Sequence, residues 1–212
     1  MIIAVFGASG RLGHQFIDAA TVAGHTLRLH YRAKPSALVP EHSTVIVGSL
    51  ADPTAVREVL RGADAAVVFL GHKDDARVPY IAAATKLIVN AMKALAMSRL
   101  LVVTGATVGE SSGNLGLAMK ITGAFARRSA HDGMMEDRDE QERLVRNSRL
   151  DGWTVVKPSR LTEGPRSDAV RMAPTLPVGM GSKVSRASLA KVLVQDLEAP
   201  QYIHQSVFVA ER

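Results

Sequence analysis

Short apolar runs alternate along the chain with longer segments in which apolar residues recur every three or four positions. The runs are rich in Val, Ile and Leu, which is typical of strands, and several are apolar throughout, as strands covered on both faces are. The predicted strands are Ile2–Phe6, Thr26–Tyr31, Thr44–Val47, Ala65–Leu70, Leu100–Val103, Thr154–Val156 and Ser206–Val209.

Helical spacing marks the segments between these runs. In one of them Ile81, Ile88 and Met92 fall on one face of a helix, and Pro53 suits the first turn of another. The predicted helices are Arg11–Ala23, Pro53–Leu60, Val78–Met97, Glu136–Asn147 and Ser185–Leu197. Because alternating strands and helices imply right-handed crossovers, we expect an α/β fold with a doubly wound parallel sheet and helices on both of its faces.

Two irregular stretches interrupt the alternation. Residues 104–133 are rich in Gly, Ser and Thr, and residues 159–184 contain several Pro and Gly. No linker or internal repeat is visible, so we expect one domain, 1–212, in which 105–131 and 159–184 form a small lobe over the carboxyl edge of the sheet. One possible helix, Leu115–Arg128, is either a lid with a basic rim or an amphipathic helix packed on that lobe.

Three glycines follow the first predicted strand directly and open the first predicted helix. Gly7, Gly10 and Gly13 give the spacing G-x-x-G-x-x-G. Small residues there let the chain turn sharply, approach a pyrophosphate and pack the helix close to the strand, while free N–H groups at the helix start meet the phosphates. This position favours nucleotide binding over a purely structural turn. No Gly-Lys-Ser/Thr follows, which excludes an ATPase-type phosphate loop.

The end of the second predicted strand bears on the choice between NAD and NADP. A site that prefers NAD carries Asp or Glu there to bind the ribose hydroxyls, and the segment Leu29–Lys34 has no carboxylate. The guanidinium of Arg32 could bind a 2′-phosphate and stack on adenine, and Lys34 could add a second charge. A solvated basic loop is the alternative. Together with the glycine loop, Arg32 favours NADP(H).

Composition narrows the classes of function. The chain has 212 residues, 47% hydrophobic and 22% charged, which is typical of a globular protein. It has no Cys and no His spacing that suits a metal, so no metal site is predicted. The 26 basic residues exceed the 20 acidic ones, but the chain holds only one Trp, three Tyr and five Phe. Arg127 and Arg128 are the only adjacent basic residues, so nucleic-acid binding is not predicted.

The sequence predicts neither a secretory signal nor a membrane-spanning segment. Gly7 ends the first apolar run after five residues, and the longest apolar segment, Val78–Met97, is interrupted by Lys86, Asn90 and Lys93. We therefore expect a soluble, cytoplasmic protein without a membrane partner. The oligomeric state is left open.

Four segments carry a family resemblance that extends over almost the whole chain. They are Phe6–Gly13, Asp64–Gly71, Trp153–Pro158 and Val184–Ala190. The sequence resembles the atypical short-chain dehydrogenases/reductases, in particular the NmrA-like and biliverdin-IXβ reductase/flavin reductase-like branch. This resemblance implies a Rossmann domain that binds NADPH, with a small carboxyl-terminal lobe that forms the substrate pocket.

The resemblance also implies a role for each matching residue. The implied cofactor-binding residues are Gly7, Ser9, Gly10, Arg11, Leu12 and Gly13 for the pyrophosphate, Arg32 for the 2′-phosphate, Ser49 and Leu50 for the adenine, Leu70, Gly71, His72 and Thr104 for the ribose and nicotinamide, and Pro158 and Ser159 over the ring. Ser49 stands where relatives usually have Asp, and its hydroxyl can still accept a hydrogen bond.

Catalytic residues are harder to assign. Classical short-chain dehydrogenases use a Tyr-x-x-x-Lys pair, and none of the three tyrosines here is followed by Lys at that spacing. Thr104 and His72 are the candidates for a catalytic group, and Asp137 or Arg138 is a candidate to face the substrate. Hydride transfer to a flavin or quinone chiefly needs apposed rings and a proton, which water can deliver.

Two functions are compatible with these features. The first is an NADPH-dependent reductase of a small conjugated acceptor such as a flavin, a quinone or a pyrrole pigment. The second is a non-catalytic regulatory protein that senses NADP(H), as some NmrA-like relatives do, and the missing tyrosine–lysine pair motivates it. A sugar-nucleotide epimerase fits less well, because the chain is short for one and lacks the tyrosine.

Overall fold

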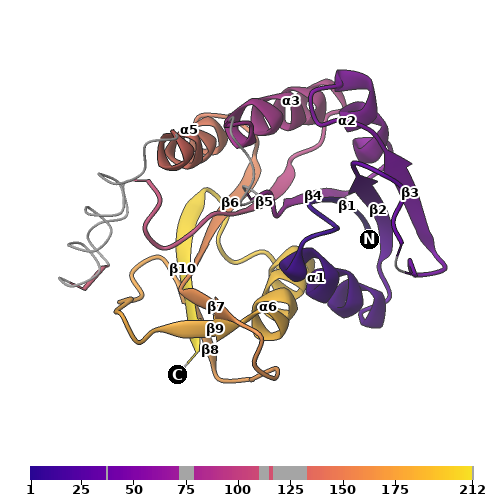
Figure 1. Ribbon diagram of the computed structural model, residues 1–212. Coiled ribbons are helices and arrows are strands. Elements are labelled where there is room, and N and C mark those ends of the chain that lie inside the picture. The colour runs from indigo at the N-terminus through magenta and orange to yellow at the C-terminus, as the bar shows by residue number, and fades with distance from the viewer. Residues whose placement is uncertain (37, 72–78, 110–114, 117–132, 212) are drawn as a thin grey trace.

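The computed structural model describes residues 1–36, 38–71, 79–109, 115–116 and 133–211. An eight-stranded sheet runs through the centre in the order β3-β2-β1-β4-β5-β6-β10-β8 (Figure 1). Its strands are β1 (Ile2–Phe6), β2 (Thr26–Tyr31), β3 (Ser43–Val47), β4 (Ala65–Val68), β5 (Arg99–Val103), β6 (Gly152–Pro158), β8 (Val170–Ala173) and β10 (Gln205–Glu211). Two further strands, β7 (Arg160–Thr162) and β9 (Lys183–Ser185), pair with each other.

In the sheet order from β3 across to β10, every pair of adjacent strands is parallel. This arrangement confirms the predicted doubly wound α/β fold. β8 is an addition, because it pairs with β10 in the antiparallel direction, with Ala173 opposite Phe208. Antiparallel edge strands are common on such sheets. The sequence did not predict β8, since it is short, only partly buried and set in a stretch rich in Pro and Gly.

The winding of the sheet reverses between β1 and β4. β2 pairs with one side of β1 and β4 with the other, so that Val5 lies opposite both Leu29 and Val67. The chain moves outward to β3 on the first side and to β5 and β6 on the second. Ligands of open α/β sheets bind outside the carboxyl ends of the strands at such a reversal. The fold therefore places a ligand crevice beside Gly7, directly after β1.

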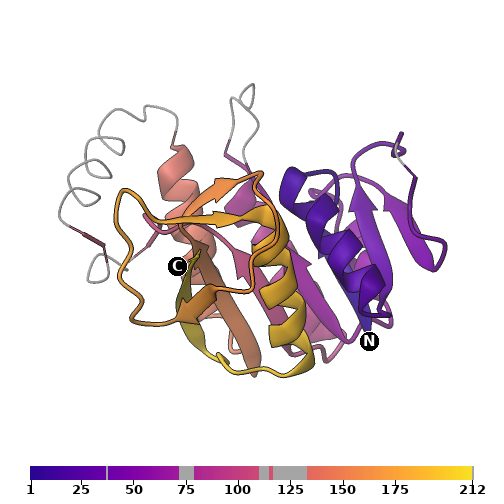
Figure 2. The same cartoon turned by 90° about the horizontal axis from the view of Figure 1, so that it is seen from below.

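Helices cover both faces of the sheet, as the alternation predicts. One face carries α1 (Arg11–Val22) and α6 (Arg186–Glu198), which lie side by side in Figure 2, and the other carries α2 (Pro53–Leu60), α3 (Ile81–Ala94) and α5 (Met134–Arg146). β1 shows why the strands are apolar throughout. Ile3 and Val5 pack in the layer under α1 and α6, whereas Ala4 and Phe6 pack in the layer under the other three helices.

The largest difference from the predicted helices is at α3, which begins at Ile81 and ends at Ala94. Asp137 of α5 fixes its start, because the carboxylate accepts hydrogen bonds from the backbone N–H groups of Tyr80, Ile81 and Ala82 at 3.1, 2.8 and 2.9 Å. These donors have no partner inside a helix, so a side chain must satisfy them. The cap comes from another helix, and local sequence therefore does not reveal it.

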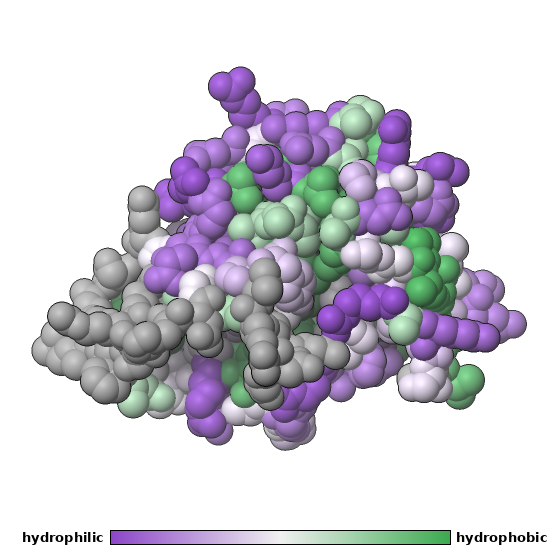
Figure 3. All heavy atoms as spheres, turned by 45° about the horizontal axis from the view of Figure 1, so that its top comes forward, coloured by the Kyte–Doolittle hydropathy of each residue, from purple (hydrophilic) through white to green (hydrophobic). Residues whose placement is uncertain are grey.

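The outer faces of the helices are polar. Hydrophilic side chains cover most of the described surface seen in Figure 3, and apolar side chains show between them in small groups. This is the division expected of helices that pack one apolar stripe against a sheet. Among the described residues, no helix combines the length and the apolar character that a membrane crossing needs.

The two irregular stretches differ in how much of them the structure describes. Residues 159–184 contain β7 and β8 and lead into β9, and their Leu176 and Val178 pack with Ala106 and Phe208. In the first stretch, Leu115 forms a bridge to Val178, but the predicted helix over 115–128 lies outside the described residues from 117 onward. A joint lobe of both stretches therefore stays a prediction.

Candidate functional site

A cleft of about 340 Å³ opens at the carboxyl edge of the sheet beside the turn from β1 to α1. Its lining includes most residues predicted to bind the cofactor, namely Gly7, Ser9, Gly10, Arg11, Leu12, Gly13, Arg32, Leu50, Leu70 and Gly71. Four lining residues were not predicted, His30, Phe69, Tyr80 and Arg186. Lys34, Ser49, Thr104, Pro158 and Ser159 are not part of this lining, and His72 lies outside the described residues.

The glycine loop is constrained by its own backbone at two positions. Gly7 has φ +93°, in the left-handed region, and a Cβ there would lie 2.8 Å from the carbonyl oxygen of Phe69. A Cβ on Gly13 would collide with the carbonyl oxygens of Gly7 and Ala8. Both conflicts arise because α1 and the end of β4 approach the loop closely. The loop therefore requires glycine at these positions.

The first turn of α1 forms one wall of the cleft. Its N-cap is Gly10, which has extended backbone and no capping side chain, and the first turn contains no acidic residue. The N–H groups of a first turn have no acceptor within the helix, and the positive end of the helix dipole attracts anions. This wall is therefore suited to a phosphate group.

Two basic side chains lie together at the end of β2. Arg32 is exposed and lines the cleft, and His30, two residues earlier, is buried. His30 Nε2 lies 2.9 Å from the carbonyl oxygen of Gly48, and its ring is 5.8 Å from that of Phe6. Burial lowers the pKa of His30, the hydrogen bond to Gly48 opposes this, and the charge of Arg32 lowers it further. His30 is thus neutral at pH 7.

Strand periodicity could have revealed His30. Side chains two residues apart in a strand point to the same face, so a functional Arg32 implies that His30 faces the same region. Ser49 and Lys34, two other predicted cofactor-binding residues, do not line the described cleft. Both are exposed and outside the cleft lining, and Ser49 Oγ accepts a hydrogen bond from the backbone N–H of Ala51 at 3.1 Å. Leu50, its neighbour, is buried and lines the cleft.

Tyr80 closes the cleft beside the end of β4. Its hydroxyl donates a hydrogen bond to the carbonyl oxygen of Gly71 at 2.7 Å. Burial raises the pKa of Tyr80, and the charges of Arg32 and Arg138 oppose the rise. The residue is remote from β1 and β2 in sequence and has no lysine at the short-chain dehydrogenase spacing, so no sequence signal marked it.

Two hydroxyl groups lack partners at the ends of the next two strands. Thr104 follows β5 and Ser159 follows β6, and the Oγ1 and Oγ atoms of these residues are buried without a hydrogen bond. A buried hydroxyl without a partner costs free energy unless a ligand or water binds it. The hydroxyls of Thr104 and Ser159 therefore have unused hydrogen-bonding capacity at this edge, although neither residue lines the described cleft.

A buried ion pair holds the loop after β5. Lys157 Nζ lies 2.7 Å from Glu142 Oε2 and donates a hydrogen bond to the carbonyl oxygen of Val108 at 2.5 Å. Burial lowers the pKa of Lys157 and raises that of Glu142, and their mutual attraction opposes both shifts. Gly109 is required here, because it has φ +67° and a Cβ would lie 2.6 Å from the Glu142 carboxylate. The lysine of the predicted Val156-Lys157-Pro158 segment thus fixes a loop.

The two candidates for facing the substrate have different surroundings. Asp137 is buried, and its carboxylate caps α3 through three backbone N–H groups. Arg138 lies beside the end of β4, with Nη2 3.6 Å from the position of a Cβ on Gly71. Burial lowers the pKa of Arg138, and Tyr80 and Asp137 oppose this.

The cleft is rich in positive charge. Arg11, Arg32 and Arg186 line it, and among the lining residues that the structure describes there is no carboxylate. Glu163, outside the lining, pairs with both Arg11 and Arg186. Within the described ranges, no cluster of three His, Asp or Glu side chains could hold a metal ion. The described cleft therefore has the chemistry of a site for a phosphorylated anion.

The fold and this cleft define a Rossmann-type protein with a dinucleotide-binding edge. A model of a protein family described as NAD(P)H-binding matches residues 7–200, and the chain belongs to this family. The match confirms the resemblance seen in the sequence and the assignment of an NAD(P)-type cofactor. It begins at the first glycine of the loop and extends to the end of α6.

Solved structures with the same fold cover nearly the whole chain. A short-chain dehydrogenase/reductase from Veillonella parvula in complex with NADP has a TM-score of 0.79 and 19% identity, over 99% of this chain and 94% of that one. An anaerobillin reductase from Escherichia coli O157:H7 has a TM-score of 0.80 and 20% identity, over 100% and 97%. A candidate NADH-flavin reductase from Streptococcus pneumoniae has a TM-score of 0.76 and 20% identity, over the full length of both chains.

Proposed function

We propose that this protein is a reductase that binds NADPH and transfers a hydride to a small conjugated acceptor such as a flavin, a quinone or a pyrrole pigment. The observation that carries the proposal is the convergence of the glycine loop, the first turn of α1 and the guanidinium of Arg32 on one cleft. Family membership supports the dinucleotide. The structural likeness to a bilin reductase and a candidate flavin reductase supports the class of acceptor.

The preference for NADPH over NADH rests on Arg32. The end of β2 carries this guanidinium and no carboxylate, so the site offers a cation to a 2′-phosphate and no acceptor to a ribose 2′-hydroxyl. A guanidinium binds a phosphate through two parallel hydrogen bonds. His30 stands beside it as a neutral ring whose Nε2 is engaged by Gly48, so Arg32 is the charged member of this pair.

One wall of the cleft and two hydroxyls outside its described lining would serve the remaining parts of the cofactor. The first turn of α1 would hold the pyrophosphate, and the buried hydroxyls of Thr104 and Ser159 would bind the carboxamide, which offers both a donor and an acceptor. When bound, NADPH supplies the hydride from its nicotinamide ring. Hydrogen bonds from Thr104 and Ser159 would orient the ring, and water would deliver the proton to the acceptor.

The cofactor assignment is tested by titrating the protein with NADPH and with NADH and measuring both dissociation constants. A charge-assisted pair is worth about 1.5–3 kcal/mol, so NADPH should bind about ten- to a hundredfold more tightly than NADH. Arg32→Ala should remove most of this preference and leave NADH binding nearly unchanged. Lys93→Ala, which removes an exposed charge in the last turn of α3 and outside the cleft lining, is the matched control. Equal affinities in the unmutated protein would contradict the 2′-phosphate role.

Turnover is tested separately, by following NADPH oxidation without oxygen in the presence of a flavin, a quinone and a linear tetrapyrrole. Oxidation with at least one acceptor is expected. NADPH binding without oxidation by any of them would favour the alternative, a protein that senses NADP(H), for which the lack of a Tyr-x-x-x-Lys pair is the motivating observation.

A further inference from the structure

A single carboxylate oxygen joins two parts of the cleft that are far apart in sequence. Glu163 Oε1 accepts hydrogen bonds from Nη1 of Arg186 at 2.7 Å and from Nη1 of Arg11 at 3.2 Å. Arg11 is the first residue of α1, and Arg186 is the first residue of α6. Glu163 follows β7 directly. The carboxylate therefore connects the glycine loop with the carboxyl-terminal part of the chain.

The two arginines differ in how far they can move. The side chain of Arg186 is only 12% exposed and lines the cleft, whereas those of Glu163 and Arg11 are 59% and 76% exposed. Arg186 is thus held at the cleft wall, whereas Glu163 can turn toward solvent because its own side chain is largely exposed.

The charge balance of the cleft depends on this carboxylate. Arg11 and Arg186 repel each other, and Glu163 offsets that repulsion while the two guanidiniums share its oxygen. A dinucleotide carries negative phosphates into the same space, where the arginines attract it and Glu163 repels it. The phosphates and Glu163 would therefore compete for Arg186.

We propose that Arg186 is a phosphate-binding residue of the dinucleotide site and that Glu163 is its exchangeable counter-ion, displaced when the dinucleotide binds. The proposal rests on the proposed NADPH-binding function and adds a third phosphate-binding feature to it, after the first turn of α1 and Arg32. It also gives the segment after β7 a function. Glu163 does not line the cleft, yet its charge would set the affinity of the cleft for the dinucleotide.

The test compares two variants that each remove one negative charge from the same segment. Glu163→Gln removes the charge that pairs with Arg186, and Asp168→Asn removes an exposed charge that pairs with Lys191 at 2.6 Å, outside the cleft lining. Dissociation constants for NADPH are measured by calorimetry at low and at physiological salt. Glu163→Gln should bind NADPH about three- to tenfold more tightly at low salt, and less so at higher salt, because salt screens exposed charges. Asp168→Asn should change the constant less than twofold.

A second pair of variants separates the counter-ion role from a merely structural one. Arg186→Gln should weaken NADPH binding about tenfold. Glu163→Gln added to Arg186→Gln should then give little further change, since the carboxylate acts through Arg186. Thermal unfolding of each variant shows that it is folded.

Several outcomes would overturn the proposal. One is an affinity of Glu163→Gln for NADPH that is equal to or lower than that of the unmutated protein. Another is an equal gain in affinity in Asp168→Asn, which would indicate a general effect of charge. Absence of NADPH binding to the unmutated protein would refute the proposed function and this inference together. Normal binding with no effect of Glu163→Gln would refute this inference alone.

Discussion

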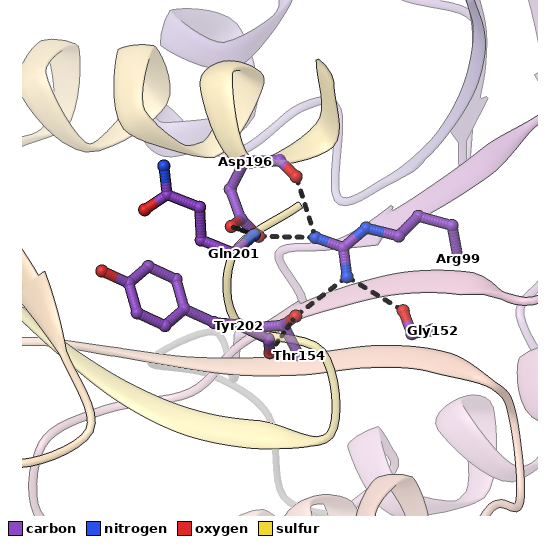
Figure 4. Close-up of polar contacts among 6 residues, drawn as sticks. All are labelled: Arg99, Gly152, Thr154, Asp196, Gln201 and Tyr202. Atoms are coloured by element: carbon purple, nitrogen blue, oxygen red, sulfur yellow. Dashed lines mark hydrogen bonds and ion pairs between the residues drawn. The ribbon is translucent and has the colours of Figure 1, made fainter. Parts of the chain in front are cut away.

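The protein pairs arginine with a carboxylate at both edges of its sheet, with opposite consequences. At the carboxyl edge, Arg11 and Arg186 share one oxygen of an exposed Glu163 beside the cleft. At the amino edge, Arg99 and Asp196 form a buried pair with Nη2 2.5 Å from Oδ2, and their side chains are only 9% and 4% exposed (Figure 4). Residue types alone do not separate the two arrangements.

The amino-edge pair is held by hydrogen bonds within the protein, although Nε of Arg99 is buried without a hydrogen bond. Arg99 Nη1 donates to the carbonyl oxygen of Gly152 and to Thr154 Oγ1, and Nη2 donates to both the carbonyl and the carboxylate of Asp196. Asp196 in turn accepts the backbone N–H of Gln201 (Figure 4). Burial lowers the pKa of Arg99, and Asp196 opposes this. This network joins β5, β6 and the end of α6.

The difference between the two edges indicates how to separate structural from functional charges here. A buried charge whose polar partners all belong to the protein stabilises one arrangement of the chain. A cation whose counter-ion is exposed and shared can exchange it for a ligand. We therefore expect mutations at the amino edge to change the free energy of unfolding and mutations at the carboxyl edge to change NADPH affinity.

The largest expected effect is at the amino edge. Asp196→Ala leaves the guanidinium of Arg99 buried without its counter-ion, which should lower the free energy of unfolding by about 3–5 kcal/mol. Urea denaturation measures the loss. The double variant Arg99→Met with Asp196→Ala should regain part of it, because no unpaired charge remains. Asp168→Asn, which removes an exposed partner, is the control and should leave the free energy of unfolding nearly unchanged. A small loss in Asp196→Ala would contradict a structural role.

The next effect is at the glycine loop. Gly13→Ala places a Cβ against the carbonyl oxygens of Gly7 and Ala8, so α1 must move away from the loop. We expect a loss of stability of about 1–3 kcal/mol together with NADPH binding weakened at least about tenfold. Gly179→Ala is the control, because a Cβ there meets nothing within 4 Å. Unchanged NADPH affinity in a folded Gly13→Ala protein would show that the loop does not hold the cofactor.

Asp137 tests this comparison. Its carboxylate is hydrogen-bonded within the protein, but it lies on the same helix as Arg138, close to the cleft. Its three backbone N–H partners predict a structural role despite this position. Asp137→Ala should cost about 1–2 kcal/mol of stability, as the loss of a helix cap does. Asp137→Asn, which keeps one oxygen acceptor, should cost less. If Asp137→Ala instead weakened NADPH binding and left stability unchanged, hydrogen bonding within the protein would not distinguish structural from functional charges.

The sequence predicted the fold because the fold depends on local patterns. The apolar runs and helical spacing placed the parallel strands of the central sheet and the described helices, but not the short strands β7, β8 and β9. The glycine triplet with Arg32 placed the cleft at the end of β1. Tyr80 and Arg186 were missed because the topology brings them to this edge from distant segments. The cap from Asp137 was missed for the same reason, and β8 because its pairing with β10 leaves no apolar run in the sequence.

The smallest expected effect concerns His30, a neutral side chain at the cleft wall. Its pKa is lowered, first by burial and also by Arg32, while the unfolded chain has the ordinary value near 6.5. The unfolded state therefore binds more protons as the pH falls below about 6.5, and stability decreases through this window. His30→Gln, which cannot titrate and keeps a donor for Gly48, should flatten that decrease between pH 7 and pH 5 in urea denaturation.

His30 also tests the assignment of Arg32 through a different observable. If a 2′-phosphate neutralises Arg32, one of the causes that lower the pKa of His30 disappears, so NADPH should raise the pKa of His30 measured by NMR. NADH lacks that phosphate and should raise it less. Equal pKa values of His30 with both cofactors would place the 2′-phosphate away from Arg32, and the positive charge at the end of β2 would then be a feature of the surface rather than of the site.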